Sequence, residues 1–315
     1  MNDQHRPTLS VVVPLYNEEQ VIAEMHSRLQ AVLGAQGLDF EIILVNDGSR
    51  DRTEELAKAI CRDHANVRLL SFSRNFGHQI AVTAGLDNSV GQAVVIIDAD
   101  LQDPPEVIID MLEKWRAGCH VVYGVRLQRK GESLFKVVTA AAFYRLMRRL
   151  TGVDIPVDTG DFRLMDRQVV EQLLTMRERN RFVRGMVSWV GFRQEKVEYV
   201  REPRFAGETK YPFKKMLRFA IDGVLSFSDV PLKISSVFGL LCALFSFLLI
   251  LYGLGVKLFY PQFAIPGWAS VFSAVLFLGG VQLMCIGILG EYLGRVYDEI
   301  KGRPLYVVRE RTNFR

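Results

Sequence analysis

The fold of this chain is decided by the stretch Ala93-Val94-Val95-Ile96-Ile97-Asp98-Ala99-Asp100-Leu101-Gln102-Asp103. Its apolar half predicts a buried strand that delivers the carboxylates behind it to the edge of a sheet. Asp98, Asp100 and Gln102 form a set of hard oxygen ligands, which suits Mg²⁺ or Mn²⁺ and, through the metal ion, a diphosphate. A solvated acidic turn is the alternative interpretation of these residues taken alone.

The residues on either side of this stretch alternate short apolar runs with helical patterns. The predicted strands are Leu9–Val13, Glu41–Val45, Val67–Phe72, Ala93–Ile97 and Val121–Tyr123. The predicted helices are Glu18–Leu33, Arg52–His64, His78–Asn88 and Pro105–Ala117. Strands that alternate with helices predict a mostly parallel α/β sheet, covered on both faces, which binds its ligands at the carboxyl ends of the strands.

Polar residues follow the first four predicted strands, where such ligands bind. A single cluster of this kind is explained by a helix cap, but four at one sheet edge indicate a nucleotide pocket. Tyr16 is expected to stack on a base, and Asp47 is expected to accept a hydrogen bond from a base or a ribose. The sequence has no G-x-G-x-x-G and no Walker lysine loop, so the diphosphate is expected to bind through a metal ion.

Two long charge-free segments lie near the C-terminus, Ile234–Val256 and Leu258–Gly290. Each exceeds the roughly 20 residues that a membrane-spanning helix needs. Prolines near the start of the second segment divide it, so we expect a transmembrane hairpin with helices at about 234–256 and 269–290. A pair of buried core helices is the alternative.

The net charge of +4 conceals an uneven distribution. Residues 1–125 hold 10 basic and 18 acidic side chains, a balance of −8, whereas residues 126–233 hold 22 and 13, a balance of +9. A basic segment next to membrane spans attracts anionic head groups and phosphates, and the adjoining spans argue against a nucleic-acid partner. Basic residues flank the hairpin, which predicts that the sheet domain and both termini lie in the cytoplasm. The chain is therefore expected to be a multi-pass protein of the inner (plasma) membrane.

These patterns divide the chain into four expected segments. They are a cytoplasmic sheet domain over 1–210, a juxtamembrane interface region over 211–232, the hairpin over 233–292 and a cytoplasmic C-terminal tail over 293–315. Ser133–Leu150 and Tyr211–Leu225 are basic and amphipathic, which is typical of helices that lie in the membrane interface. Ordinary core packing is the alternative for both.

Three motifs resemble those of a known family. Val13–Glu19, Val45–Asp51 and Asp98–Glu106 are similar to the motifs of inverting family 2 glycosyltransferases, which have the GT-A (Rossmann-like) fold. Later segments narrow the resemblance to polyprenyl-phosphate glycosyltransferases, and nearest to the bactoprenol (undecaprenyl-phosphate) glucosyltransferases, which also end in two spans. These segments are Thr159–Met165, Arg181–Gly185, Ser188–Gly191, Arg204–Tyr211 and Gly290–Arg295.

The resemblance implies a UDP-sugar donor, in the first place UDP-glucose, a polyprenyl phosphate acceptor, and Mg²⁺ or Mn²⁺ at Asp98, Asp100 and Gln102. The residues that it assigns to the nucleotide sugar are Pro14, Tyr16, Asn17, Glu18, Asp47, Asp98, Arg204 and Lys210. Those assigned to the acceptor phosphate are Arg126 and Lys136, and those assigned to catalysis are Asp100, Asp161 and Arg163. GDP-mannose or a UDP-4-amino-arabinose derivative as donor, and a homo-oligomeric assembly, stay open as alternatives.

The implied acceptor is a phosphate monoester, whose second pKa of about 6 leaves its oxygen largely ionised at neutral pH. A strong general base is therefore not required. Asp161 is expected to position the sugar or the acceptor, and a base role or a structural pair with Arg163 are the alternatives. An in-line attack would invert an α-linked donor to a β-linked lipid phosphosugar.

Three rival functions share part of this pattern. A processive polysaccharide synthase would have a Q-x-x-R-W segment and more spans, and the sequence has neither. A non-catalytic membrane protein whose sheet domain senses a nucleotide is the rival from another class. It would have polar residues lining its spans, and apart from serines and Gln282 these spans have few. A non-catalytic partner-binding protein would tolerate the loss of Asp98 and Asp100, whereas an enzyme would not.

Overall fold

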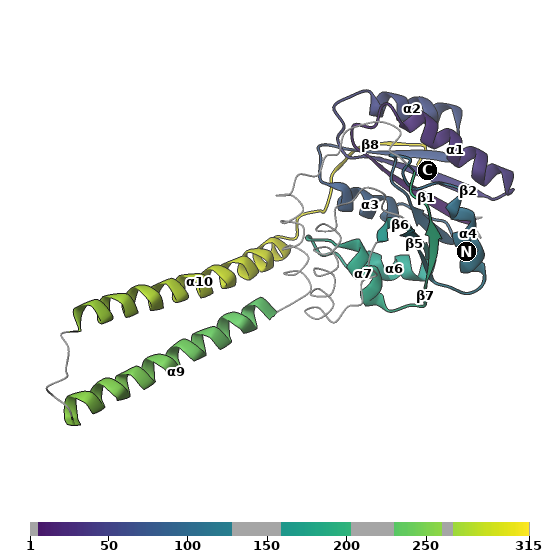
Figure 1. Cartoon of the computed structure of the whole chain (residues 1–315). Helices are drawn as coiled ribbons and strands as arrows, with labels where there is room; N and C mark the ends of the chain where they lie inside the picture. The colour runs from purple at the N-terminus through teal and green to yellow at the C-terminus, as the bar shows by residue number, and fades with distance from the viewer. Residues whose placement is uncertain (1–5, 128–158, 203–229, 260–266, 315) are drawn as a thin grey trace. The chain divides into compact units, whose positions relative to one another are not determined.

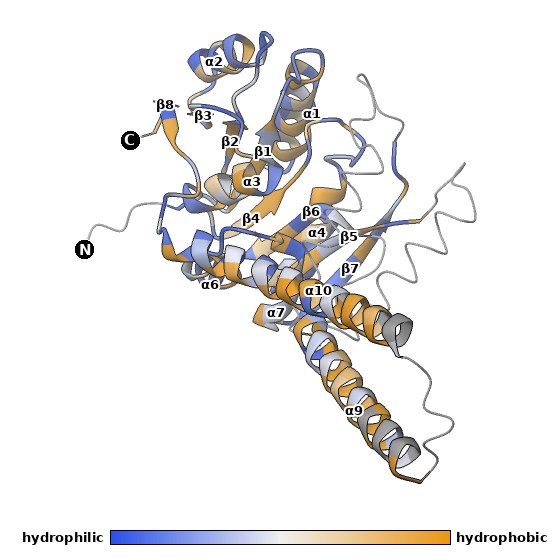
Figure 2. Ribbon diagram, turned by 90° about the vertical axis from the view of Figure 1, so that its left-hand side faces the viewer, coloured by the Kyte–Doolittle hydropathy of each residue, from blue (hydrophilic) through white to orange (hydrophobic). Residues whose placement is uncertain are grey.

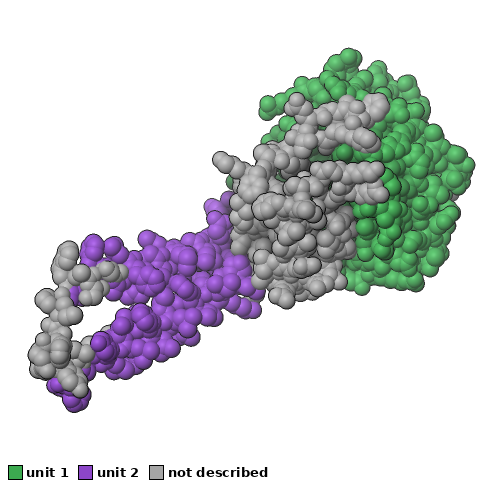
Figure 3. All heavy atoms as spheres, viewed as in Figure 1, with its two compact units in different colours: residues 1–212, 303–315 green, residues 213–302 purple. Residues whose placement is uncertain are grey.

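The chain divides into two compact units (Figure 3), one of residues 1–212 with 303–315 and the other of residues 213–302. In the first unit the described residues form one sheet with helices on both faces (Figure 1), and in the second they form two long helices. The structure is a computed structural model, and it describes residues 6–127, 159–202, 230–259 and 267–314.

Parallel pairing dominates the sheet, as the alternation of strands and helices predicts. The strands are β1 Leu9–Leu15, β2 Phe40–Asn46, β3 Val67–Phe72, β4 Ala93–Ile96, β5 Val121–Arg126, β6 Thr159–Asp166, β7 Gln194–Tyr199 and β8 Val308–Thr312. Their order among the described residues is β7-β5-β6-β4-β1-β2-β3-β8. β6 runs antiparallel between β4 and β5, β8 runs antiparallel beside β3, and the other neighbours are parallel.

The strands and helices predicted before residue 126 are confirmed, with shifted ends. The helices described in this unit are α1 Ile22–Ala35, α2 Thr53–Asp63, α3 His78–Asp87, α4 Val107–Arg116, α6 Arg167–Thr175 and α7 Val183–Val190. The first helix was predicted from Glu18 but begins at Ile22. The backbone N–H of Glu18 donates to Thr53 Oγ1 at 2.8 Å and that of Glu19 to Asp51 Oδ2 at 3.3 Å, which keeps this segment in a loop beside α2.

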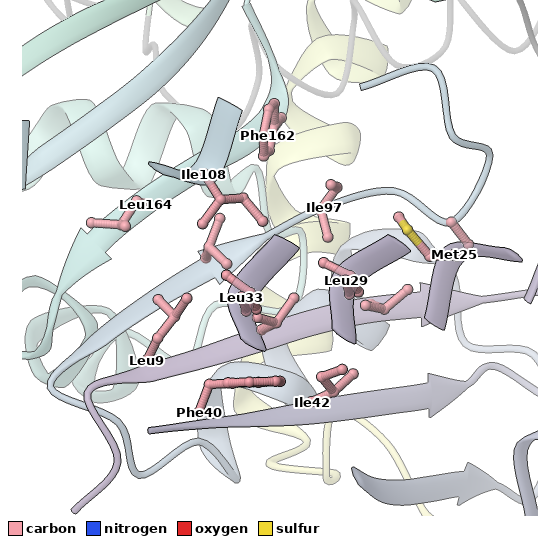
Figure 4. Close-up of a cluster of buried hydrophobic side chains, with 14 of the residues drawn as sticks. Leu9, Met25, Leu29, Leu33, Phe40, Ile42, Ile97, Ile108, Phe162 and Leu164 are labelled. Carbon is pink, nitrogen blue, oxygen red and sulfur yellow. The ribbon is translucent and has the colours of Figure 1, made fainter. Parts of the chain in front are cut away.

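The central strands β1 to β4 are buried on both faces, which explains why they are largely apolar. Val11 and Val13 of β1 belong to the core cluster on one face, where side chains of α1 pack over β1 and β2, and Ile108 of α4 lies beside Phe162 and Leu164 of β6 (Figure 4). Val12 points to the opposite face, and α3 lies so close there that a Cβ on Gly85 would be 2.1 Å from Val12 Cγ1. Ligands therefore have access to the sheet at its strand ends.

The strand β6 was not predicted, and it joins β5 and β7 to the rest of the sheet. Its register places Arg163 opposite Ile96 of β4. Phe162 lies in the core cluster, so its neighbours Asp161 and Arg163 face the other side, toward α3 and α7. In this antiparallel register Asp161 comes across from Asp98, which follows β4 by two residues.

The C-terminal segment returns to the sheet unit. Within the predicted C-terminal tail, 293–315, residues 303–315 belong to this unit, where β8 pairs with β3. The Tyr306 ring stacks on Phe72 with centroids 5.1 Å apart, and its hydroxyl donates to Asp87 Oδ2 at 2.7 Å. β8 has the sequence Val-Arg-Glu-Arg-Thr, and its charged side chains gave no apolar signal for a strand.

The two helices of the second unit are long and apolar enough to cross a membrane, by length and composition (Figure 2). α9 spans Val230–Phe259 and α10 spans Trp268–Ile300, and together they contain both predicted spans. Only 11% and 6% of the residues in their apolar windows are buried, so apolar side chains lie exposed along both helices. The predicted amphipathic helices Ser133–Leu150 and Tyr211–Leu225 lie outside the described residues.

Truncating Tyr306 tests how much the C-terminal segment stabilises the sheet unit. Tyr306→Ala should lower the free energy of unfolding by about 2 kcal/mol, because it removes both the ring stacked on Phe72 and the hydrogen bond to Asp87. Tyr306→Phe keeps the ring and should cost about 1 kcal/mol. Denaturant unfolding followed by tryptophan fluorescence measures both, and equal losses would show that the stacked ring contributes nothing.

Candidate active site

The acidic loop that follows β4, residues 98–103, is held in a defined turn. The backbone N–H of Gln102 donates to Asp100 Oδ1 at 3.2 Å, and Leu101 adopts a positive φ of 58°. Asp98 Oδ1 is buried and, among the described residues, has no hydrogen-bond partner. The Asp98 side chain as a whole keeps 34% of its surface exposed, so part of this carboxylate is open to a ligand.

Asp161 of β6 is held by side chains from two helices. Its Oδ2 accepts a hydrogen bond from Gln79 Nε2 at 3.0 Å and lies 3.1 Å from His78 Nε2, while its Oδ1 accepts from Arg184 Nε at 2.7 Å. His78 and Gln79 begin α3, and Arg184 lies in the first turn of α7. Gln79 Oε1 also accepts from the backbone N–H of Val183 at 3.0 Å, which ties the two helix starts together.

The charges of this cluster are arranged around His78, whose Nε2 is 3.6 Å from Asp98 Oδ1. Burial alone would raise the pKa of Asp161, but Arg184 and His78 outweigh it and hold this pKa well below its usual range. Burial alone would lower the pKa of His78, yet Asp98 and Asp161 raise it to about 9, so the imidazole is a cation at neutral pH. Burial and neighbouring carboxylates raise the pKa of Asp98 to about 6, so its charge is less well compensated than that of Asp161.

The ion pair of Asp161 is made with Arg184, whereas the sequence offered a structural pair with Arg163 only as an alternative. Arg163 is buried in β6, its Nη2 donates to the Gly160 carbonyl at 3.1 Å, and burial lowers its pKa to about 10. The roles of His78, Gln79 and Arg184 were missed. Their signals were weak: His78 directly follows the polar cluster after β3, and Arg184 lies in a segment noted only for its resemblance.

Asp103, the third carboxylate of the acidic loop, turns toward β5 and β7 and is buried. Its Oδ1 accepts the hydroxyl hydrogen of Tyr199 and lies 3.7 Å from Arg126 Nη2. Arg126 Nε in turn donates to the Tyr199 oxygen at 3.4 Å. The structure therefore brings Arg126, which was predicted to contact the acceptor phosphate, to the same loop that carries Asp98 and Asp100.

The residues predicted to bind the nucleotide shape the loops after β1 and β2. Asp47 is buried, and its two oxygens accept backbone N–H hydrogen bonds from Phe76 at 2.6 Å and Gly77 at 3.0 Å; burial raises its pKa despite these bonds. Asn17 has a positive φ of 54°, and its Oδ1 accepts from the backbone N–H of Arg50 at 2.8 Å. The remaining members lie beside them: Pro14 is buried within β1, and Tyr16 and Glu18 are half-buried in the loop that follows.

The donor set at the acidic loop fits a divalent cation that a substrate also binds. Among the described residues, no three His, Cys, Asp or Glu side chains converge on one metal position. Mg²⁺, however, is commonly held by one or two carboxylates together with substrate phosphates. Asp98 Oδ1, which has no hydrogen-bond partner among the described residues, the raised pKa of Asp98 and the nearby Asp100 and Gln102 suit such a site. Lys136, Arg204 and Lys210 lie outside the described residues.

Comparison with known proteins agrees with the sequence motifs. Residues 10–174 match glycosyl transferase family 2, and residues 230–296 match the GtrB C-terminal hairpin. The uncharacterized glycosyltransferase YkcC of Bacillus subtilis is 52% identical over 301 residues, which cover 96% of this chain and 93% of the relative. The bactoprenol glucosyl transferase of Shigella phage SfII is 42% identical over 304 residues, which cover 96% of this chain and 97% of the relative.

Among solved structures, glucosyl-3-phosphoglycerate synthase from Mycobacterium tuberculosis is similar with a TM-score of 0.48 and 21% identity, over 70% of this chain and 78% of that one. The family assignment rests on the two full-length relatives and on the domain matches, which confirm the predicted resemblance. The chain belongs to glycosyl transferase family 2, with a mostly parallel α/β domain of the GT-A type followed by a GtrB-type C-terminal hairpin.

Proposed function

We propose that this protein transfers a glucosyl group from UDP-glucose to undecaprenyl phosphate, or a similar polyprenyl phosphate, with inversion at the anomeric carbon. The observation that carries the proposal is the similarity over 96% of the chain, hairpin included, to bactoprenol glucosyl transferases, whose name gives both the sugar and the lipid. The product is a β-linked polyprenyl-phosphate glucose, formed at the cytoplasmic face of the membrane.

The chemistry of the acceptor sets what the protein must supply. A lipid phosphate monoester has a second pKa of about 6 and brings its own anionic nucleophile at neutral pH. The protein then has to align this oxygen with the anomeric carbon and to stabilise the charge that develops on the departing UDP. Asp161 acts in this scheme as a fixed negative charge that positions the sugar, because Arg184 and His78 keep it ionised and hydrogen-bonded.

The donor side of the site is assigned to the acidic loop. Asp98, Asp100 and Gln102 would hold Mg²⁺ or Mn²⁺, which when bound supplies positive charge to the diphosphate leaving group. Arg204 and Lys210 are assigned to the same diphosphate. The last described residue before them, Glu202, supports this, because its backbone N–H donates to the Gln102 carbonyl at 3.0 Å.

The acceptor side is assigned to Arg126 and Lys136, with Arg163 and the basic residues of 126–233 creating a field that attracts a phosphate. Arg126 ends β5 at the carboxyl edge of the sheet, and Asp103 connects it to the acidic loop. The nucleotide itself is assigned to the loops around Tyr16 and Asp47. A guanidinium suits the acceptor because its planar fork matches two phosphate oxygens.

A donor screen tests the proposed reaction. Purified protein in detergent is incubated with undecaprenyl phosphate and, separately, UDP-glucose, GDP-mannose or a UDP-4-amino-arabinose derivative, and lipid products are separated by chromatography. UDP-glucose should give a lipid-linked hexose whose β configuration is read by NMR. Product from another donor alone would change the sugar assignment, and an α-linked product would contradict inversion.

Metal dependence is expected from the acidic loop. Transfer should vanish in EDTA and return on addition of Mg²⁺ or Mn²⁺, because the diphosphate leaving group then regains its counter-charge. Asp100→Asn should lose activity while its thermal unfolding stays unchanged. Asp110→Asn, which changes an exposed carboxylate on α4, is the matched control and should keep wild-type rates. Full activity in chelator would rule out the metal.

Asp161 provides a test of the fixed-charge role. Asp161→Asn should lower kcat by about 100-fold or more, because the site loses a preorganised charge, while the affinity for UDP stays the same. Gln79→Ala is the graded comparison, because it removes the Gln79 hydrogen bonds to Asp161 and to the Val183 N–H but keeps both Asp161 and the Arg184 guanidinium that pairs with it. A wild-type kcat for Asp161→Asn would show that this carboxylate takes no part in the reaction.

Membrane topology gives an independent prediction. Tags at residues 1 and 315 should both be cytoplasmic, because basic residues flank the two apolar helices. Gln262→Cys, between α9 and α10, should react with a membrane-impermeant maleimide added to intact cells. The wild-type chain, which has Cys242 and Cys285 in the two helices but no cysteine between the helices, gives the background labelling. Labelling of a terminal tag from outside would contradict the assigned orientation.

A further inference from the structure

Asp103 differs from the other aspartates of the acidic loop in what it contacts. It is buried, with 1% of its surface exposed, and three groups converge on its Oδ1. They are the Tyr199 hydroxyl, which donates a hydrogen bond, the Arg126 guanidinium at 3.7 Å and Arg201 Nε at 3.9 Å. Asp103 is thus a counter-ion for the arginines that end β5 and follow β7.

Two glycines leave the space in which this contact forms. A Cβ on Gly160 would lie 2.8 Å from Arg126 Nη2, so the guanidinium lies directly against the backbone of β6. A Cβ on Gly124 would lie 2.7 Å from the Tyr199 ring, so the ring lies directly against β5. Gly160 and Phe162 share one face of β6, so the Arg126 guanidinium lies on the face opposite to the Asp161 side chain, near the end of the strand that carries both.

We propose that Asp103 and Tyr199 are positioning residues that hold the Arg126 guanidinium toward the acceptor phosphate, and that Gly160 provides the space for it. This inference rests on the proposed function, in which Arg126 binds that phosphate. Among the described residues, the contacts of Arg126 use its Nε and Nη2, and a guanidinium carries five N–H donors, so the held fork keeps donors for a phosphate.

The contacts with Asp103 and Tyr199 hold the Arg126 side chain in one orientation before the lipid binds. An unrestrained arginine loses rotamer freedom when it binds, and restraint by Asp103 and Tyr199 removes that loss from the binding step. Asp103 lies three residues after Asp100 in one turn, so the same loop carries the assigned metal ligands and the group that aims the acceptor arginine. The shared loop thereby fixes the position of the assigned metal ligands relative to the Arg126 guanidinium.

Kinetics of the full-length protein with varied undecaprenyl phosphate test the inference, alongside calorimetry with UDP and Mg²⁺. Arg126→Ala should raise the KM for the lipid about 10-fold or more, and Tyr199→Phe about 3- to 10-fold, with UDP affinity unchanged in both. In the double variant Tyr199→Phe should add nothing further, because it acts through Arg126. Tyr306→Phe removes a hydroxyl from another aspartate-bound tyrosine, distant in sequence, and should leave the KM unchanged.

Gly160→Ala tests the position of the Arg126 guanidinium by adding a methyl group next to it. The added methyl group meets the end of a flexible side chain and can be accommodated by moving it, so the variant should fold, keep its UDP affinity and show the same raised lipid KM. An unchanged lipid KM in Arg126→Ala, in Tyr199→Phe or in Gly160→Ala would overturn the positioning role, as would an added effect of Tyr199→Phe in the double variant. Failure of the wild-type protein to glycosylate undecaprenyl phosphate would instead contradict the proposed function.

Discussion

Negative charge crowded at one end of the sheet is the constraint on which this domain depends. Five aspartates lie at the edge of the sheet where the parallel strands β1, β2 and β4 end: Asp47, Asp98, Asp100, Asp103 and, from the antiparallel β6, Asp161. Carboxylates removed from water and placed near one another are costly unless each is paired or hydrogen-bonded. The fold therefore has to bring a partner to each of the buried ones, and two of its unpredicted elements do so: α7 supplies Arg184 to Asp161, and β7 supplies Tyr199 to Asp103.

The negative charges of these aspartates are not compensated equally, and the difference agrees with the proposed chemistry. Backbone N–H groups hold Asp47, a tyrosine and arginines hold Asp103, and Arg184 with His78 holds Asp161. These three carboxylates are fixed parts of the structure. Asp98 keeps a buried oxygen without a hydrogen-bond partner among the described residues, and its raised pKa reflects that. A cation delivered with the donor would complete what the protein leaves uncompensated at this position.

Local sequence patterns were sufficient for the parallel part of the fold. Each strand from β1 to β5 is an apolar run whose burial on both faces follows from its own composition, and the ends of these strands revealed Asp47 and Asp98. β6, β7 and β8 were not predicted, because they mix charged and apolar residues and are stabilised by pairing with strands that are distant in the sequence. The residues that pair with the aspartates of the site were missed because they too are distant in the sequence. Tyr199 is 96 residues from Asp103, and Arg184 is 23 residues from Asp161.

The place of β8 in the chain has a consequence for biosynthesis. Among the described strands it is the last to leave the ribosome, after both apolar helices, and until then the edge of β3 that pairs with β8 is open. Such an edge is a template for pairing with other chains. A polypeptide that ends before its hairpin is made keeps this edge uncovered and Phe72 without its stacked partner Tyr306. Incomplete products therefore carry a recognisable defect for chaperones and proteases, and only chains that contain both helices can close the sheet.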